Sequence, residues 1–348
     1  MPKKINILIT TGIYPPKVGG PSQYAKELEE EFKRRGYFVK VITYKIEHRL
    51  PIVIRHIVFF FRAVLNLFGK DFVISLDTFS TGFPTVLACF LFRKKNAIRI
   101  GGDFLWESYV ERTGHMVPLN NFYLEHKKFS TKEKIIHFLT KFVLKNTSSP
   151  VFNTKWQKNI FVRDYKLSQP KADSPLVKNT KNIYVIENFI GEKEKSEKYL
   201  KKNFLWYVRD IKLKNGLLLK EAFENVKQKS GEIILETGNL SHEKLFQKIK
   251  DCYAVILPSL SDIGPNYILD AIRFNKPFIL TKYSDYYEKF KNIGIFVDPL
   301  NKKDIEEKIL YLADEKNYSK QQNKIKQCNI SHSWSQIADE FINIYKTL

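Results

Sequence analysis

The stretch from Tyr253 to Tyr283 constrains the fold more than any other part of this sequence. It begins with the apolar run Tyr253–Leu257, which has the length and β-branched content of a buried strand. A turn-rich loop leads to Pro265, which suits the first position of a helix because its missing N–H costs nothing there. The pattern predicts a helix over 266–274, ended by Asn275 in the left-handed conformation, and then a second strand. Such a strand-loop-helix-strand unit builds parallel, doubly wound sheets.

Two acidic residues flank the start of the predicted helix. Asp262 lies in the loop after the first strand, and Asp270 lies about one and a half turns into the helix. Between them we expect the N–H groups of Asn266, Tyr267 and Ile268 to lack an intrahelical partner and to favour an anion. A phosphate with a hydroxyl-bearing group on each side fits this pattern, and a nucleotide-sugar has that composition. The alternative is an ordinary helix cap with a solvated aspartate.

The composition favours two domains and anionic partners. The chain has 348 residues, 43% of them hydrophobic, which is enough for a core in each of two domains. Lys and Arg outnumber Asp and Glu by 58 to 37, and the net charge of +21 favours nucleic acid, a lipid surface or phosphorylated ligands. Cys89, Cys252 and Cys328 show no paired spacing, so we expect a reducing compartment without a disulfide framework or zinc site. No apolar run has the length of a signal peptide or membrane span.

The N-terminal part opens with a strand, a turn-rich loop and a helix. Ile5–Thr10 has the pattern of a buried strand, and the loop 12–21 contains the paired glycines Gly19 and Gly20. We expect Ser22 to cap the helix that follows and Gly36 to end it. Glycine-rich loops at this position bind phosphates in doubly wound folds, although a plain tight turn explains the pattern equally well.

Asp262 and Asp270, separated by seven residues, resemble the donor-site motif of the GT-B glycosyltransferases of family 4, which has Glu at both places. The resemblance implies that Asp262 faces the sugar and Asp270 the ribose hydroxyls. It further implies a donor site that includes these residues: Gly264, Asn266, Tyr267 and Ile268. The opening of the chain is similar to that of the same family, so Gly19 and Gly20 are expected to let the backbone approach the donor diphosphate or the acceptor.

A basic loop in the second half of the chain adds to this resemblance. Phe204–Val208 predicts a strand, a helix follows from Leu217, and Arg209 and Lys214 flank the loop between them. The spacing matches the family's phosphate-binding Arg and Lys. Arg offers a bidentate fork to phosphate and Lys a mobile point charge. In isolation, basic residues in a protein of this charge would mean little. After the first strand of a second α/β domain, they indicate a diphosphate site without a metal.

The first domain contains one further candidate for the reaction. Asp103 and Glu107 follow the predicted strand Ala97–Ile100, at the end where ligands bind in open α/β sheets. Many members of the family place a His near this point, and here Asp103 is the candidate for a catalytic or sugar-positioning role. The alternative is that Asp103 caps the segment that follows.

Two apolar and basic segments suggest a membrane surface. Ile54–Lys70 is very apolar, with Arg55, Arg62 and Asn66 along one stripe, and Lys127–Lys145 contains six lysines and one acid. Such segments lie on anionic leaflets. The alternatives are a helix packed on the sheet for the first and a merely solvated basic face for the second.

The resemblance covers nearly the whole chain and implies an α/β protein of the GT-B fold, with two Rossmann-like domains facing a cleft. We predict an acceptor domain over 1–192, a nucleotide-sugar domain over 193–332, a linker over 191–203, and a final helix over 334–345 that crosses back to the first domain. The resemblance also implies a retaining, hexosyltransferase-type enzyme that needs no metal or other cofactor and uses a glycan or lipid-linked acceptor.

On this view Arg209, Lys214 and the helix end stabilise the leaving diphosphate, and no dedicated nucleophile is required. We expect a cytoplasmic protein, with peripheral attachment to the inner face of the membrane as an open alternative. Two other classes remain. One is a non-catalytic nucleotide-sugar binder, favoured by the Asp substitutions and the absent His. The other is a nucleic-acid-binding protein, which lacks a recognisable reader motif, so no nucleic-acid partner is expected.

Overall fold

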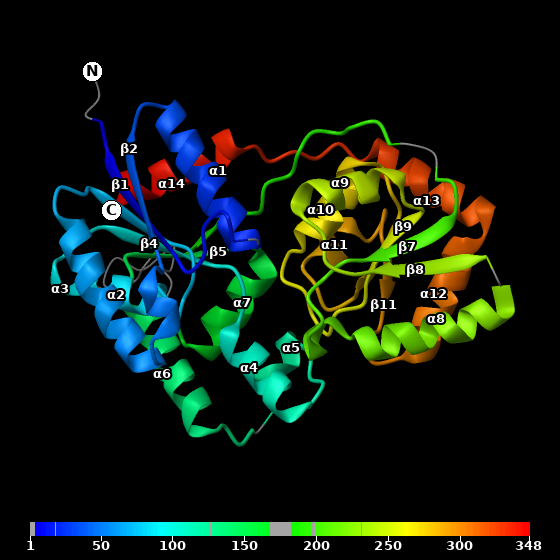
Figure 1. Cartoon of the computed structure of the whole chain (residues 1–348), viewed down its shortest axis with the longest axis horizontal. Helices are drawn as coiled ribbons and strands as arrows, with labels where there is room; N and C mark the ends of the chain where they lie inside the picture. The colour runs from blue at the N-terminus through cyan, green and yellow to red at the C-terminus, as the bar shows by residue number, and fades with distance from the viewer. Residues whose placement is uncertain (1–3, 18, 126, 168–181, 197–198, 231) are drawn as a thin grey trace, which may run out of the picture. The chain divides into compact units, whose positions relative to one another are not determined.

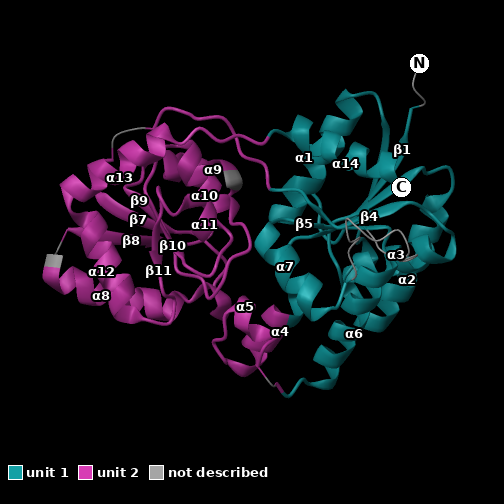
Figure 2. Ribbon diagram, turned by 180° about the vertical axis from the view of Figure 1, so that it is seen from behind, with its two compact units in different colours: residues 1–105, 128–187, 333–348 teal, residues 106–127, 188–332 magenta. Residues whose placement is uncertain are grey.

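The computed structural model describes residues 4–17, 19–125, 127–167, 182–196, 199–230 and 232–348 (Figure 1). The chain forms two compact units, distinguished by colour in Figure 2. Unit 1 comprises residues 1–105, 128–187 and 333–348, and unit 2 comprises residues 106–127 and 188–332. Each unit is an α/β domain built on a parallel sheet, as the strand-loop-helix-strand pattern predicts.

Unit 1 contains a sheet in the order β2-β1-β3-β4-β5-β6, in which all neighbouring strands are parallel. Its inner strands are buried on both faces, which explains why they read as continuous apolar runs. The strands are β1 (Asn6–Thr11), β2 (Phe38–Thr43), β3 (Phe72–Ser75), β4 (Asn96–Ile100), β5 (Ser149–Phe152) and β6 (Tyr184–Val185). The helices are α1 (Gly20–Arg34), the 3₁₀ helix η1 (Ile46–Arg49), α2 (Ile52–Leu67), α3 (Gly82–Leu91), α6 (Thr131–Asn146), α7 (Lys155–Asp164) and α14 (Trp334–Thr347).

The helices of unit 1 cover both faces of the sheet. In both views α1 and α14 lie on one face, and α2, α3 and α6 lie on the other (Figures 1 and 2). The final helix, α14, belongs to unit 1, where it packs on α1. Trp334 contacts Tyr24 edge to face at 5.0 Å, and Arg35 forms an ion pair with Asp339 at 2.5 Å.

Unit 2 contains a second parallel sheet in the order β11-β10-β9-β7-β8. One apolar core lies between this sheet and α8 and α12, and another lies between the sheet and α10 and α11. The strands are β7 (Lys202–Trp206), β8 (Ile233–Thr237), β9 (Ala254–Leu257), β10 (Phe278–Thr281) and β11 (Ile295–Val297). The helices are α5 (Leu119–Phe122), the 3₁₀ helix η2 (Lys212–Lys214), α8 (Gly216–Ser230), α9 (His242–Asp251), α10 (Asn266–Arg273), α11 (Tyr286–Phe290), α12 (Lys302–Ala313) and α13 (Glu315–Gln327). Helix α4 (Phe104–Thr113) begins in unit 1 and continues in unit 2.

The predicted linker over 191–203 is wrong in its described part, which packs on unit 2. Lys193 donates to the carbonyls of Ile272 and Ile325, and Glu194 forms ion pairs with Arg273 and Lys250. The unit boundary instead falls between Glu187 and Asn188, five residues before the predicted one. Charge density alone suggested a linker here, but Lys193 and Glu194 are held by contacts with unit 2.

Residues 106–127 were expected in the first domain, and the compact units place them in unit 2. The physical reason is a set of hydrogen bonds to two loops of that unit. Leu119 N–H donates to Ser261 Oγ at 2.9 Å, and the Lys212 ammonium donates to the Glu111 carbonyl at 2.8 Å. Lys127, expected at the start of a basic face, is also turned inward, and its ammonium lies 4.6 Å from the centre of the Phe122 ring.

Candidate functional site

Three loops meet at the carboxyl edge of the unit 2 sheet and fix one another. Asn215 is buried in the left-handed conformation, with φ of 57°, and its amide donates to the carbonyls of Pro258 at 3.2 Å and Pro299 at 2.6 Å. Leu260 N–H donates to the Leu213 carbonyl at 2.8 Å. One side chain thus ties the loops after β7, β9 and β11. The sequence named Asn215 only as a neighbour of the basic loop, although an Asn-Gly pair is itself a sign of a left-handed turn.

Gly216, the next residue, sets the path of the basic loop by packing. A Cβ at this position would lie 2.4 Å from Cη2 of Trp206, whose ring is buried. We predict that Gly216→Ala lowers the free energy of unfolding by about 1–3 kcal/mol, because the rigid indole cannot yield without backbone movement. Urea denaturation measures this loss. Gly12→Ala is the control, since its Cβ would make an ordinary contact of 3.8 Å with Asp77, and an equal effect of both variants would contradict the packing argument.

Two of the predicted site residues, Lys214 and Asp262, form an ion pair at this edge. The Lys214 ammonium lies 2.6 Å from Asp262 Oδ2, and the two side chains are 21% and 13% exposed. The loop carrying Asp262 is held in turn, because Asp262 N–H donates to the Tyr283 carbonyl at 3.1 Å. An ammonium has three donors, so Lys214 can keep this partner and still bond a second anion. Sequence spacing predicted both residues but not their contact.

Arg209 lies on the same loop as Lys214 and is exposed. Its backbone carbonyl accepts a hydrogen bond from Ile211 N–H at 3.0 Å. No described residue forms an ion pair or hydrogen bond with its guanidinium. The fork of this side chain is therefore available for a bidentate contact to an anion.

Helix α10 begins where the sequence predicts, but two N–H groups are free at its start instead of the predicted three. Pro265 precedes its first residue, and Asn275 adopts the left-handed conformation after its end, with φ of 54°. The expectation that Ile268 N–H lacks an intrahelical partner is wrong, since it donates to the Pro265 carbonyl at 3.1 Å. The N–H groups of Asn266 and Tyr267 have no acceptor among the described residues, so two donors mark this helix end.

Gly264 and Tyr267, the two remaining donor-site candidates around this helix, form hydrogen bonds within unit 2. The carbonyl of Gly264 accepts from the side-chain amide of Asn188 at 2.7 Å. The Tyr267 ring is buried, and its hydroxyl accepts a long hydrogen bond of 3.5 Å from Tyr207 N–H. Tyr267 thereby joins α10 to the loop after β7, and only its backbone N–H can reach a ligand.

Asp270 is a half-buried carboxylate on α10. Burial raises the pKa of Asp270 to about 7, and the nearby positive charge of Arg273 only partly opposes this rise. No described residue donates a hydrogen bond to its side chain, and Arg273 is itself paired with Glu194. A desolvated carboxylate without a donor is costly, and hydroxyl groups of a ligand would remove that cost.

A second carboxylate of unit 2, Glu236 on β8, was missed by the sequence. Burial raises the pKa of Glu236, but hydrogen bonds from Lys248 at 2.8 Å and Asn203 at 2.9 Å outweigh it and hold the pKa below its usual value. The Tyr207 hydroxyl also donates to Glu236 at 3.4 Å. The protein itself supplies hydrogen-bond donors to Glu236, whereas no described residue supplies one to the side chain of Asp270.

Gly19 and Gly20 lie in unit 1 after β1, at the start of α1. Gly19 is the residue before the helix, with φ of 156°, and a Cβ there would lie 2.8 Å from the Ile13 side chain. A Cβ on Gly20 would meet nothing within 4 Å. The expectation that Ser22 caps this helix is wrong, because Ser22 lies inside the first turn and is buried. Packing therefore requires a glycine at position 19, whereas the space beside Gly20 is open.

Asp103, the remaining candidate, is buried in unit 1 just past β4. Its Oδ1 accepts a hydrogen bond from Leu105 N–H at 3.0 Å, at the start of α4. This is the contact that the capping alternative predicts. A catalytic or sugar-positioning role for Asp103 stays a prediction.

In the described ranges no three His, Cys, Asp or Glu side chains form a cluster that could hold a metal ion. Within the same ranges, no helix combines the length and apolarity needed to cross a membrane.

Comparisons with known proteins identify the fold. No family model matches the sequence, and neither does any curated protein. Sucrose-phosphate synthase from Thermosynechococcus elongatus is similar in structure, with a TM-score of 0.68, 12% identity and 99% of each chain covered. A trehalose-phosphate synthase from Burkholderia xenovorans, in complex with glucose-6-phosphate, matches with a TM-score of 0.65 and 11% identity over 98% of this chain and 100% of that chain.

A third structure shows that this likeness does not select a reaction. A putative UDP-N-acetylglucosamine 2-epimerase from Listeria monocytogenes matches with a TM-score of 0.56 and 12% identity, over 99% of this chain and 96% of that chain. Fold and activity are separate conclusions, because one fold supports several chemistries. With two parallel sheets of doubly wound type and matches over almost the whole chain, the protein has the α/β architecture of the GT-B fold.

Proposed function

We propose that the protein is a glycosyltransferase that moves a sugar from a nucleotide-sugar to an acceptor in glycan, glycolipid or cell-surface polysaccharide synthesis. The observation that carries this proposal is the arrangement at the carboxyl edge of unit 2. There, the paired Lys214 and Asp262 lie on loops joined by a backbone hydrogen bond, and α10 begins with two free N–H groups and carries the unpaired Asp270. Cations and a helix end suit a diphosphate, and carboxylates on either side suit hydroxyl groups.

In this proposal the donor-site residues bind three parts of the donor: the diphosphate, the sugar and the ribose. Arg209 and Lys214 bind the diphosphate, together with the N–H groups of Asn266 and Tyr267. Asp262 accepts hydrogen bonds from the sugar, and Asp270 accepts them from the ribose. Because the positive charges come from side chains and a helix end, the proposal includes no metal or other cofactor.

The proposed reaction is a retaining transfer of hexosyl type. The bond between the anomeric carbon and the diphosphate oxygen breaks, and the electron pair leaves with the diphosphate. The acceptor oxygen forms the new bond on the same face, and its proton passes to the departing diphosphate. Arg209 and Lys214 stabilise the negative charge that develops on the leaving group, so electrostatic stabilisation is the main contribution.

The acceptor site belongs to unit 1 in this proposal. The open space at Gly20 supports a close approach of a ligand to the backbone after β1. Asp103 follows β4 at the carboxyl edge of the same sheet, where it would position the acceptor or the transferred sugar. The thiols of Cys89, Cys252 and Cys328 are free, which supports a reducing compartment, the cytoplasm.

A non-catalytic nucleotide-sugar binder is the second candidate function. The hydrogen bond between Asp103 and Leu105 favours it, because that bond gives Asp103 a structural purpose without any role in a reaction. A thermal-shift panel of nucleotide-sugars selects the donor. Incubation with that donor, isotope-labelled in its sugar, then separates the two functions: an enzyme releases or transfers the label, and a binder returns the donor intact.

The raised pKa of Asp270 predicts how binding depends on pH. Hydroxyl donors favour the charged carboxylate, so a bound ribose lowers the pKa of Asp270 from about 7, and binding releases a proton. The affinity for a nucleoside diphosphate should therefore rise as the pH rises towards 7 and level off above it, by roughly tenfold per unit at most. Calorimetry across this range measures the slope.

The matched control for this prediction is Asp270→Asn, which cannot titrate. The diphosphate's own ionisation affects both proteins alike, so the difference between their slopes isolates Asp270. Equal slopes in the two proteins would contradict the assignment of Asp270 to the ribose.

A further inference from the structure

Helix α2 of unit 1 directs its polar stripe into the protein. The Arg55 guanidinium donates to the carbonyls of Glu47 and Leu50, both at 3.0 Å. Arg62 forms an ion pair with the buried Glu47 and donates to the Thr43 carbonyl. These arginines fasten α2 to the turn η1 and to the end of β2. The polar stripe predicted for this segment therefore does not face solvent.

The opposite side of α2 is apolar and exposed. Its inner side packs on the sheet through Phe59, Ala63 and Leu67, as the packing alternative predicts. Among the outer residues, Phe61 is 61% and Leu65 is 72% exposed. Every exposed residue of this helix is apolar: Ile52, Val53, Ile54, Ile57, Phe61 and Leu65. A helix of a globular protein has the reverse arrangement, with charged residues outward.

The exposed apolar surface continues across the end of α3. The ring of Phe68, after α2, contacts the ring of Phe92 edge to face at 6.4 Å. Phe90, Leu91 and Phe92 are each about half exposed. We call the exposed residues of α2 together with Phe68 and 90–92 the apolar face. Contiguous exposed surfaces of this kind mark interaction sites.

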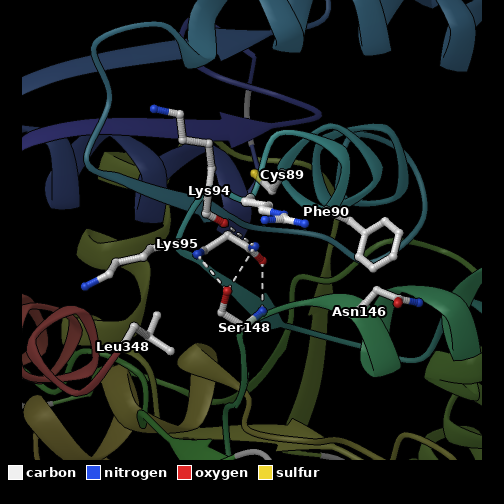
Figure 3. A pocket seen from close by; sticks show the side chains of 9 residues that line it. Cys89, Phe90, Lys94, Lys95, Asn146, Ser148 and Leu348 are labelled. Atoms are coloured by element: carbon white, nitrogen blue, oxygen red, sulfur yellow. Dashed lines mark hydrogen bonds between the residues drawn. The ribbon is translucent and has the colours of Figure 1, made fainter.

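The segments that form the apolar face carry cations and no acid. The two segments that form it, 52–70 and 82–95, contain six Lys or Arg and no Asp or Glu. Arg93, Lys94 and Lys95 follow its last aromatic residue and line a hollow of about 250 Å³. Figure 3 shows Phe90 on one side of this hollow and Lys95 on the other. A basic hollow thus opens directly beside exposed aromatic rings.

We propose that the apolar face docks on the surface of an anionic phospholipid bilayer. Its apolar side chains enter the boundary between headgroups and acyl chains, and the cations at Arg93, Lys94 and Lys95 meet lipid phosphates. This combination of an exposed apolar stripe and adjacent Lys and Arg is the one that interfacial helices use. It assigns the membrane contact to α2 and the end of α3, and it does not involve the solvated lysines of α6.

The charge pattern argues against a second copy of the chain as the occupant. A two-fold contact brings the same patch of both copies together. Arg55 and Arg62 point inward, but the other four cations of each copy, Lys70, Arg93, Lys94 and Lys95, would then meet the same four, and neither segment offers an acid to pair with them. An anionic leaflet pairs with all of them at once.

The test is sedimentation with vesicles of phosphatidylcholine alone and of phosphatidylcholine mixed with phosphatidylglycerol, at low and high salt. We expect binding to the anionic vesicles only, reversed by salt. Phe61→Ser with Leu65→Ser should weaken this binding at least tenfold, and Arg93→Gln with Lys95→Gln should weaken it at low salt. The matched control is Leu124→Ser with Leu200→Ser, which removes two exposed leucines from unit 2 and should leave binding unchanged.

Three results would overturn the proposal. They are no binding to anionic vesicles at low salt, binding of the Phe61→Ser, Leu65→Ser variant as strong as that of the wild type, and binding to neutral vesicles as strong as that to anionic ones. Gel filtration without lipid adds a fourth, since a dimer abolished by the Phe61 and Leu65 substitutions would make the face an interface between copies. Circular dichroism of each variant verifies folding. None of these measurements requires transferase activity, so their outcome is independent of the proposed function.

Discussion

Arg209→Ala is expected to weaken binding of nucleoside diphosphates by roughly tenfold or more. Hydrogen bonds between charged partners contribute about 1.5–3 kcal/mol, and about 1.4 kcal/mol corresponds to a factor of ten. The guanidinium is exposed and has no partner among the described residues, so its removal breaks no internal contact and should leave stability unchanged. Calorimetric titration with a nucleoside diphosphate measures the change directly.

Lys214→Ala should weaken the same binding by a comparable factor, but with a second consequence. The substitution also leaves Asp262 without its ion-pair partner. Because both side chains are partly shielded, stability should fall as well, whereas Arg209→Ala has no such effect.

Lys212→Ala is the control for both variants. Lys212 carries the same charge on the same loop, but its ammonium donates to the Glu111 carbonyl at 2.8 Å. Its loss should change binding little beyond the general effect of one positive charge. Equal affinities in wild type, Arg209→Ala and Lys214→Ala would show that the diphosphate does not bind at this loop.

Asp270→Asn and Asp262→Asn are expected to separate binding from turnover. Asp270→Asn should weaken nucleoside-diphosphate binding, because the ribose loses a charged acceptor. Asp262→Asn should leave that binding nearly intact and impair turnover of the nucleotide-sugar, because Asp262 is assigned to the sugar. Titration with the nucleoside diphosphate and a turnover assay with labelled donor give the two readouts. The reverse pattern would show that the two roles are exchanged.

Asp270→Asn should also stabilise the folded protein at high pH. The pKa of Asp270 in the folded protein is about 7, above its ordinary value of 3.8, so the wild type loses stability as the pH rises towards 7. A neutral Asn removes this loss, and the gain above pH 7 should be on the order of 1–4 kcal/mol, vanishing below the ordinary pKa. Urea denaturation across the pH range measures it. A variant that binds more weakly but folds more stably is what a carboxylate kept for a ligand predicts.

Much of the fold could be predicted from apolar runs, and the reason is burial. Strands β4 and β9 are buried along their whole length, and the sequence located both to within one residue. Helix α13 was missed because its signal is sparse. Only Tyr318, Gln321 and Ile325 are buried on it, and the rest of the helix is polar. Periodicity cannot identify a helix whose buried side is this narrow.

The candidate site could be predicted in its residue types but not in its contacts. Spacing named Lys214 and Asp262 separately, while their ion pair depends on how loops after two different strands meet. The hydrogen bond from Ile268 to Pro265 depends on a tight first turn, which the rule for free N–H groups at helix ends does not anticipate. The outward apolar side of α2 depends on arginines that turn inward to backbone carbonyls, and no pattern of residue types specifies that direction.

The most direct test of the central claim is release of nucleoside diphosphate from a nucleotide-sugar labelled in the sugar. The donor is the one that most stabilises the protein in a thermal-shift panel. We predict release of the nucleoside diphosphate together with labelled sugar or labelled product by the wild type, and strong loss of this release in Arg209→Ala and Asp262→Asn. Lys212→Ala should retain it. Undiminished release by Arg209→Ala and Asp262→Asn, or a donor recovered intact from the wild type, would contradict the assignment of a glycosyltransferase site to unit 2.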